Sequence, residues 1–433
     1  MSLLFTNATL VNLEPAAVTP HAQLRCREGR IAGLGRELAA EPGEEVVDLG
    51  GALLMPGLVV GHHHLYSALA RGMPFSGEPP KDFHDTLKKI WWKVDSALDE
   101  ETNYCSALAG ALDAVRFGVT GIIDHHASPG AVDGSLDAIA RGLEEVGLRG
   151  LLCYEVSDRD GADVARAGIA ENRRFQAARV QDPLLRGMIG AHASFTIGDD
   201  TLDRLAELCH DSGAGIHIHL LEDAVDRSLS LERYGADPVR RLADRELLQE
   251  NAILSHGVHL TPDEVLKLRE ARVLFAHNAR SNMNNRVGAA AVSTFGERVV
   301  LGTDGIDGDI LAEARCAMFR GREHRPPVDM GQVVSMLRGS GKALEEYFGC
   351  AVGELAVGAA ADLTVLDYDP PTPLTSDNLI GHLAFGWGAH LVRSVIVAGR
   401  FVYRNRQFTT VDAAALAERT RAAATALWRK LGQ

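Results

Sequence analysis

The sequence predicts an α/β fold, a (β/α)8 TIM barrel joined to a small β-sandwich domain that both chain ends build. Eight short apolar runs follow one another through the middle of the chain, and longer helical patterns separate most of them. That alternation is typical of a parallel barrel. Alternating, β-rich sequence stands in residues 1–55 and returns in 361–369 and 392–407. We therefore expect both ends to share one small sheet domain.

Each predicted domain follows from its local pattern. Gly and Asn divide residues 1–55 into short strands, which form the first part of the β-sandwich. The barrel takes residues 56–350 and the second part of the sandwich takes 351–410. Residues 411–433 are Ala-rich and amphipathic, which predicts a C-terminal helix. The eight barrel strands are expected in 57–64, 119–126, 148–155, 186–192, 214–219, 251–256, 272–277 and 299–304.

Composition excludes several classes of function. The 433 residues carry a net charge of −14 and no run of Lys and Arg, so we expect no nucleic-acid partner. The six cysteines are widely spaced and form no C-x-x-C pair, which favours a reduced, cytoplasmic protein. Neither a signal peptide nor an apolar run of membrane-spanning length is present, so no membrane partner is expected.

Three consecutive histidines end the first apolar run. Side chains alternate along a strand, so His62 and His64 share one face and His63 lies on the other. A hydrogen-bonded polar strand end is the alternative to a metal site. Nearly every other run also ends in a polar, mostly ligand-capable residue, and the C-terminal strand ends of a barrel converge where catalysis occurs. This pattern favours a metal site.

We expect His62, His64, His219 and Asp304 to hold one divalent metal ion. These nitrogen and oxygen ligands suit Zn²⁺, with Fe²⁺ as the alternative. His217 shares the face of His219 and is the alternative ligand, but His219 lies nearer the strand end. The metal would lower the pKa of a bound water toward about 7 and so supply hydroxide at neutral pH.

Three side chains near these ligands are candidates for proton transfer. Asp304 could ligate the metal and also take the proton of the water. Glu222 could carry a proton to the leaving group, although a solvated carboxylate at a helix start is the alternative. His256 could hold the hydroxide or polarise the bond under attack.

The spacing of the lysines favours a single metal. No lysine lies between Lys93 and Lys267, so the middle strands offer no carboxylated lysine to bridge two ions. Glu155 is the alternative bridge.

At this point the motifs resemble those of the amidohydrolase superfamily. "MPGLVVGHHH" is similar to its opening signature and "GELAVGAAADLTVLD" to its closing β-domain motif, so the likeness covers nearly the whole chain. "HIHLLED", "ILSHGVHLTPDE" and "LFAHNARSNMNN" are similar to the branch of deaminases and chlorohydrolases, which acts on aminated heterocycles. Within that branch the sequence most resembles the SsnA-type aminohydrolases, and the 8-oxoguanine deaminases share a similar opening.

The resemblance implies roles for further residues. It implies the same four metal ligands, a proton shuttle at Glu222, and a contact between His256 and the nucleophile. It also makes His192 and His277 pocket histidines. The branch commonly reads H-C/N-P-x-S-N where this chain has Ala279-Arg280.

The remaining pocket residues are expected to contact the substrate. Arg280 either faces the substrate as a cation or covers the barrel rim, and Asn278 helps to orient the ring. For His125 we favour pocket lining or a hydrogen bond to a metal ligand. Residues 73–98 are long for a βα connection and predict a lid over the pocket. There Trp91 stacks on a flat heterocycle or, alternatively, packs in the core or against another subunit.

The predicted function is metal-dependent deamination of an aminated nitrogen heterocycle, such as a purine or pterin, by a metal-bound hydroxide. One alternative is ring-opening hydrolysis of a cyclic amide or ureide. Such cyclic amidases usually carry the lysine-bridged pair of metals that this sequence lacks. A second alternative is an inactive metal-binding barrel that serves as an assembly partner. Glu222, His256 and Asp304 are all intact, which argues against it. The resemblance also implies a homodimer.

Overall fold

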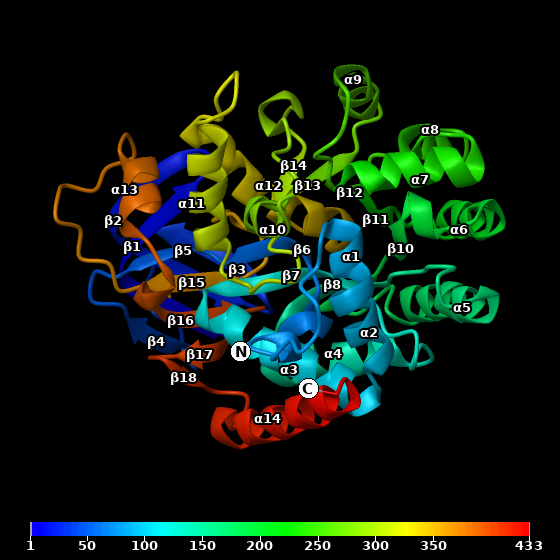
Figure 1. Cartoon of the computed structure of the whole chain (residues 1–433). Helices are drawn as coiled ribbons and strands as arrows, with labels where there is room; N and C mark the ends of the chain where they lie inside the picture. Colours follow the sequence, from blue (N-terminus) through cyan, green and yellow to red (C-terminus); the bar gives the residue numbers. More distant parts are fainter. Residues whose placement is uncertain (1, 433) are drawn as a thin grey trace.

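The middle of the chain closes into a barrel of parallel strands in the computed structural model, which describes residues 2–432 (Figure 1). Hydrogen bonds order the strands as two runs, β6 to β9 and β10 to β14. Parallel bridges between Val156 and Ala191 and between His63 and Asp304 join these runs and close the barrel. The strands are β6 (Leu58–His63), β7 (Val119–His126), β8 (Arg149–Tyr154), β9 (Leu185–Gly187) with its continuation β10 (Ile189–Ala193), β11 (Ile216–Leu220), β12 (Ile253–His256), β13 (Leu274–His277) and β14 (Val299–Leu301).

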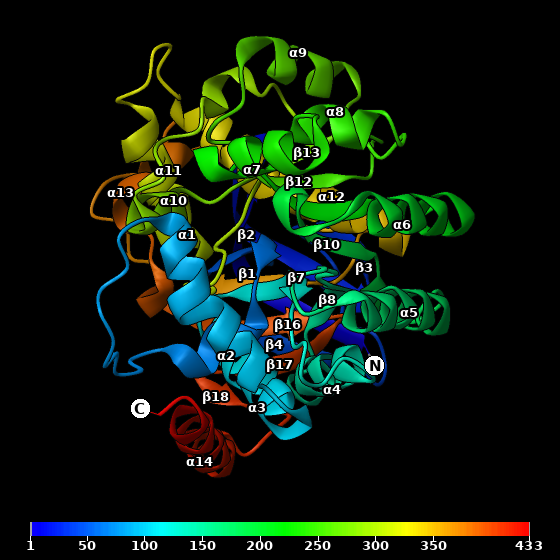
Figure 2. The same cartoon turned by 45° about the vertical axis from the view of Figure 1, so that its right-hand side comes forward.

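Helices follow the barrel strands in the order that the sequence predicts (Figures 1 and 2). Several begin with side-chain caps. Asp99, for example, accepts a hydrogen bond from the backbone of Thr102 at the start of α3. The helices after the strands are α3 (Glu100–Arg116), α4 (Ser135–Val146), α5 (Ala162–Ala178), α6 (Asp199–Ser212), α7 (Ala224–Tyr234), α8 (Pro238–Ala243), α9 (Pro262–Glu270), α10 (Ala279–Asn285), α11 (Ile310–Gly321) and α12 (Met330–Phe348).

Both chain ends meet in one connected sheet. Strand β5 pairs with β1 on one side and with β15 on the other, which brings the first and last parts of the chain together. Leu3, Phe5 and Leu363 are buried in its core. The strands of this sheet within residues 2–432 are β1 (Ser2–Leu13), β2 (Ala16–Arg27), β3 (Arg30–Gly35), β4 (Glu45–Asp48), β5 (Leu53–Pro56), β15 (Leu363–Leu366), β16 (Val392–Val397), β17 (Arg400–Arg404) and β18 (Gln407–Phe408).

The fold class that the sequence predicts is confirmed: a parallel α/β barrel with a β domain from both chain ends. The expected C-terminal helix is α14 (Ala413–Lys430), which packs against α3. The exact domain boundaries stay predictions. Among residues 2–432, none of the helices is long and apolar enough to cross a membrane.

The connection after β6 crosses the barrel rim. It begins with a short 3-10 helix (Leu65–Ala70) and continues through α1 (Phe83–Thr86), a π-helical turn (Leu87–Trp91) and α2 (Trp92–Ala97). Figure 2 shows α1 and α2 in front of the barrel strands. Side chains from this connection line the pocket at the strand ends, so its position matches that of the predicted lid.

Candidate metal centre and active site

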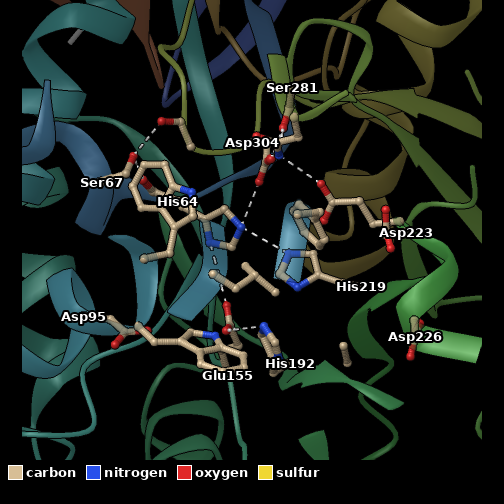
Figure 3. A pocket seen from close by; sticks show the side chains of 18 of the residues that line it. His64, Ser67, Asp95, Glu155, His192, His219, Asp223, Asp226, Ser281 and Asp304 are labelled. Atoms are coloured by element: carbon tan, nitrogen blue, oxygen red, sulfur yellow. Dashed lines mark hydrogen bonds and ion pairs between the residues drawn. The ribbon is translucent and has the colours of Figure 1, made fainter. Parts of the chain in front are cut away.

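Three of the predicted metal ligands, His64, His219 and Asp304, lie together at the C-terminal rim of the barrel (Figure 3). His62 offers a ligand atom within 4.8 Å of those of His64 and His219 in one group, which also contains His125, and of those of His219 and Asp304 in a second group, which also contains His256. His64 Nε2 lies 3.1 Å from His219 Nε2 and 3.0 Å from Asp304 Oδ1. His62 Nε2 lies 3.4 Å from the same Asp304 oxygen. Ligand atoms of a tetrahedral zinc ion, bound at about 2.0–2.2 Å, lie about 3.3 Å from one another. The spacing and the chemistry of this donor set therefore fit such an ion.

Asp304 raises the pKa of His64 to about 9 against the effect of burial, so a metal ion bound there would replace a proton of His64. Burial keeps the other two imidazoles of this centre, those of His62 and His219, neutral. It lowers the pKa of His62 to about 3 and that of His219 well below its usual range. Neutral imidazole is the form that ligates a metal. His62 Nε2 is also buried and has no hydrogen-bond partner anywhere in residues 2–432. A metal ion would give this nitrogen the partner that it lacks.

Barrel closure places Asp304 beside the two histidines. The backbone N–H of Asp304 donates to the carbonyl of His62 at 3.1 Å, and that of His64 donates to the carbonyl of Asp304 at 3.3 Å. His64 Nδ1 lies 2.6 Å from the carbonyl oxygen of His125, so Nδ1 carries the hydrogen and Nε2 faces the centre. The backbone carbonyl of His125 thus accepts a hydrogen bond from a predicted metal ligand, and a hydrogen bond to a ligand is one of the two roles expected of His125.

His217 lies deeper in the barrel than His219. Its Nε2 is 2.8 Å from His62 Nδ1, and its ring stacks on His125 with 4.5 Å between ring centroids. His219 Nε2 instead contacts His64 Nε2 at the rim. The geometry therefore favours His219 over His217 as the ligand.

Glu222 and His256 face each other beside the metal ligands. Glu222 follows β11, and its Oε2 lies 3.5 Å from His256 Nε2. Burial raises the pKa of Glu222 to about 7, although His256 opposes this shift. A carboxyl with a pKa near neutrality can donate a proton at neutral pH. His256 Nδ1 donates to Asn282 Oδ1 at 2.8 Å, which turns Nε2 toward Glu222.

Helix α10 holds partners for all three proposed catalytic groups. Ser281 donates a hydrogen bond to Asp304 Oδ2, Asn282 accepts from His256, and Asn285 Nδ2 donates to Glu222 Oε1 at 3.1 Å. Reasoning from the sequence assigned no role to these three residues. The available signal was the density of short polar side chains in "HNARSNMNN", directly after a barrel strand.

Arg280 is absent from the pocket wall that residues 2–432 form, which favours the second of its two expected roles, covering the barrel rim. Its Nε lies 2.7 Å from Glu313 Oε2 and its Nη1 lies 2.9 Å from Asp307 Oδ1. The Glu313 side chain is fully buried, so its carboxylate holds the guanidinium away from the substrate.

His277 and Asn278 are also absent from the pocket wall, as far as residues 2–432 define it. Both are buried at the end of β13. Asn278 turns toward the barrel interior and packs against Gly302, where a Cβ would lie 2.1 Å from Asn278 Oδ1. Asn278 Nδ2 also lies 3.5 Å from His256 Nδ1, so Asn278 contacts a proposed catalytic residue. A contact of His277 or Asn278 with the substrate stays a prediction.

The pocket above the centre encloses about 210 Å³. The proposed ligands His64, His219 and Asp304 form one part of its wall, together with Glu222. His192 and Trp91 line it as expected. Stacking of Trp91 on a substrate stays a prediction.

Comparisons with known proteins agree with this architecture. The sequence pattern of the amidohydrolase family matches residues 53–402. A 5-methylthioadenosine/S-adenosylhomocysteine deaminase of Nitratidesulfovibrio vulgaris is 30% identical over 96% of this chain and 95% of its own length. A 5'-deoxyadenosine deaminase of Methanosarcina acetivorans is 28% identical over 98% of both chains. The zinc-bound structure of an adenosine deaminase from Xanthomonas campestris superposes with a TM-score of 0.87 at 24% identity and covers 98% of each chain.

Proposed function

Because this chain belongs to the amidohydrolase family, we propose that it is a metal-dependent hydrolase that deaminates an aminated nitrogen heterocycle. The relatives named as deaminases support hydrolysis of a carbon–nitrogen bond. The observation that carries the proposal is the placing of Glu222 3.5 Å from His256, beside the converged ligands. A purely structural metal site needs no buried acid and base next to the ion.

His62, His64, His219 and Asp304 would hold the divalent metal. Three imidazole nitrogens and one carboxylate oxygen suit Zn²⁺, and Fe²⁺ is the alternative. When bound, such an ion lowers the pKa of a water ligand toward neutrality.

Two side chains beside the centre, those of Asp304 and Glu222, carry the protons in the proposed reaction. Water adds to the ring carbon that bears the amino group, and Asp304 takes one of its protons. Glu222, in its protonated form, gives its proton to the neighbouring ring nitrogen. Asp304 then passes its proton to the amino group, which leaves as ammonia. The remaining hydroxyl proton returns to Glu222 as the ring carbonyl forms, so that atoms and charge balance.

Neighbouring groups keep these carriers in place. Ser281 and Asn285 hold the carboxyl groups of Asp304 and Glu222, respectively. His256 Nε2 lies where it can stabilise the charge that develops on the added oxygen.

An ammonia-release screen tests the proposal. Metal-loaded protein is incubated with aminopurines, their nucleosides, pterins, triazines and cyclic amides, and product masses are recorded. We expect ammonia together with a product in which oxygen replaces the amino nitrogen. Addition of water without ammonia would support ring opening instead. No product from any compound would support the inactive, assembly-partner alternative.

The variant Glu222→Gln separates catalysis from binding. It keeps the size of the side chain but removes its acidic proton, so we expect kcat to fall by about 10²–10⁴-fold with the metal retained. An unchanged kcat would exclude Glu222 as the proton carrier. The expected homodimer and the cytoplasmic location stay predictions.

A further inference from the structure

A second buried carboxyl group, that of Glu155, lies in the pocket wall. Its Oε2 accepts no hydrogen bond from any residue within 2–432. Glu155 follows β8 and is 5% exposed. Its Oε2 lies 3.4 Å from His125 Nδ1 and its Oε1 lies 3.6 Å from His192 Nε2. Figure 3 shows Glu155 and His192 side by side, with His64 and His219 between them and Asp304. The proposed mechanism gives Glu155 no task.

Both of these imidazole nitrogens present lone pairs to Glu155. His125 Nε2 lies 3.1 Å from the carbonyl of His217, so its hydrogen is there and Nδ1 is an acceptor. His192 Nδ1 lies 2.7 Å from Thr196 Oγ1, whose hydroxyl hydrogen points to the carbonyl of Ala193. The hydrogen of His192 is therefore on Nδ1, and Nε2 is also an acceptor.

The pocket wall at this point thus needs a donor from outside the chain. Within residues 2–432, Glu155 Oε2 and His125 Nδ1 have no hydrogen-bond partner. A proton on Oε2 would pair with His125 Nδ1, but Glu155 Oε1 and His192 Nε2 would still face each other as acceptors. Both Glu155 and His192 line the pocket, so an N–H of a bound ligand can lie between these two acceptors and donate to them.

Unpaired donors lie in the same wall. Arg159 and Trp92 both line the pocket, and Arg159 Nη1 and Trp92 Nε1 are buried without a partner in the described part of the chain. The other guanidinium nitrogens of Arg159 bind Asp95 and Asp160. The ring centroids of Trp92 and His192 lie 6.3 Å apart, and the guanidinium carbon of Arg159 lies 5.3 Å from the centroid of the Trp92 ring. The acceptors of Glu155 and His192 and the unpaired donors of Arg159 and Trp92 therefore line the same pocket.

We propose that this wall binds a lactam edge of the substrate, with a ring N–H donating to Glu155 and His192 and the adjoining carbonyl oxygen accepting from Arg159 and Trp92. This inference rests on the proposed deamination and narrows its substrate class. Glu155, His192 and the metal ligand His219 offer atoms that all lie within 4.8 Å of one another. The ring N–H therefore lies next to the carbon that loses its amino group.

A 2-amino-4-oxopyrimidine ring has these features in this order: the amino-bearing carbon, the ring N–H and the carbonyl. Guanine and pterin contain that ring. The six-membered ring of adenine has neither the N–H nor the carbonyl. The proposed substrate class thus differs from the adenosine-type compounds for which the similar deaminases are named.

A matched pair of compounds tests the inference on the unmodified, metal-loaded enzyme. Guanine and 1-methylguanine differ by the ring N–H, and adenosine and 5'-deoxyadenosine lack the lactam altogether. A site built around a substrate N–H rejects an analogue without it, so we expect kcat/KM for guanine to exceed that for 1-methylguanine by at least about 100-fold. Ammonia from the adenosine-type compounds with equal or higher kcat/KM would overturn this inference and leave the deaminase proposal standing. No ammonia from any compound would overturn both.

The variant Glu155→Gln tests the wall itself. Glutamine keeps one acceptor oxygen but carries no charge, so it accepts the ring N–H more weakly than a carboxylate does, and we expect kcat/KM for guanine to fall about 10-fold, mainly through a higher KM. Glu171→Gln is the matched control, because Glu171 is equally buried but lies outside the pocket, on α5. Its kcat/KM should stay within about twofold of the unmodified enzyme.

Metal analysis of the same proteins distinguishes a ligand N–H from a second cation. We expect equal zinc content in the unmodified enzyme and in Glu155→Gln. Loss of a bound ion in this variant alone would show that the acceptors hold a cation, and would overturn the lactam inference.

Discussion

Replacing Asn285 with alanine removes the one hydrogen bond that α10 gives to Glu222. Asn285 Nδ2 lies 3.1 Å from Glu222 Oε1, and this bond favours the ionised carboxylate, against the effect of burial. A hydrogen bond to a charged group contributes about 1.5–3 kcal/mol, and about 1.36 kcal/mol corresponds to one pKa unit. Its full loss would therefore raise the pKa of Glu222 by about 1–2 units. Since 11% of the Glu222 side chain is exposed, water replaces part of the bond, and we expect about one unit.

The assay is the pH dependence of kcat/KM. Glu222 donates a proton in the proposed mechanism, so its deprotonation sets the alkaline limb of the profile. A higher pKa keeps the group protonated to higher pH, and the alkaline limb of Asn285→Ala should move up by about one pH unit. Met283→Ala changes the same helix at a residue that is 49% exposed and outside the pocket, and should cause no shift. An alkaline limb at the same pH in Asn285→Ala and in the unmodified enzyme would refute the assignment.

Three further predictions follow from contacts in the structure. Asn282→Leu removes the partner of His256 Nδ1, so kcat should fall about 10–100-fold with metal content unchanged; an unaltered kcat would contradict that role. Zn²⁺ added to metal-free protein at about 100 times its Kd should raise the free energy of unfolding by about 2.7 kcal/mol in urea titrations, an effect that Asp304→Ala should abolish. Arg280→Met leaves buried Glu313 unpaired and should lower the free energy of unfolding by about 3 kcal/mol with KM unchanged; a raised KM at full stability would return Arg280 to the substrate site.

Much of the fold follows from local sequence because each barrel strand carries its own signal. The run 57–64, for example, is apolar until it reaches its histidines, and the structure places β6 there. A barrel strand is buried on both faces, so its sequence is continuously apolar, and polar side chains become favourable only where the strand reaches the rim. The period of two along a strand likewise puts His62 and His64 on one face. Their ring centroids lie 4.9 Å apart.

The sequence by itself determined the barrel, the β domain from both chain ends, and the set of strand-end residues from which a metal centre could form. These depend on hydrophobic pattern and on strand and helix periods, which act between neighbours in the chain. Only the tertiary structure decided which of these strand-end residues contact one another. His217 and His219 share a face, but their depth in the closed barrel separates them. Arg280 is drawn to Glu313, a residue on another helix, and Glu155 meets histidines from β7 and β10. Such contacts depend on barrel closure and on pairing between distant segments, and no local pattern records them.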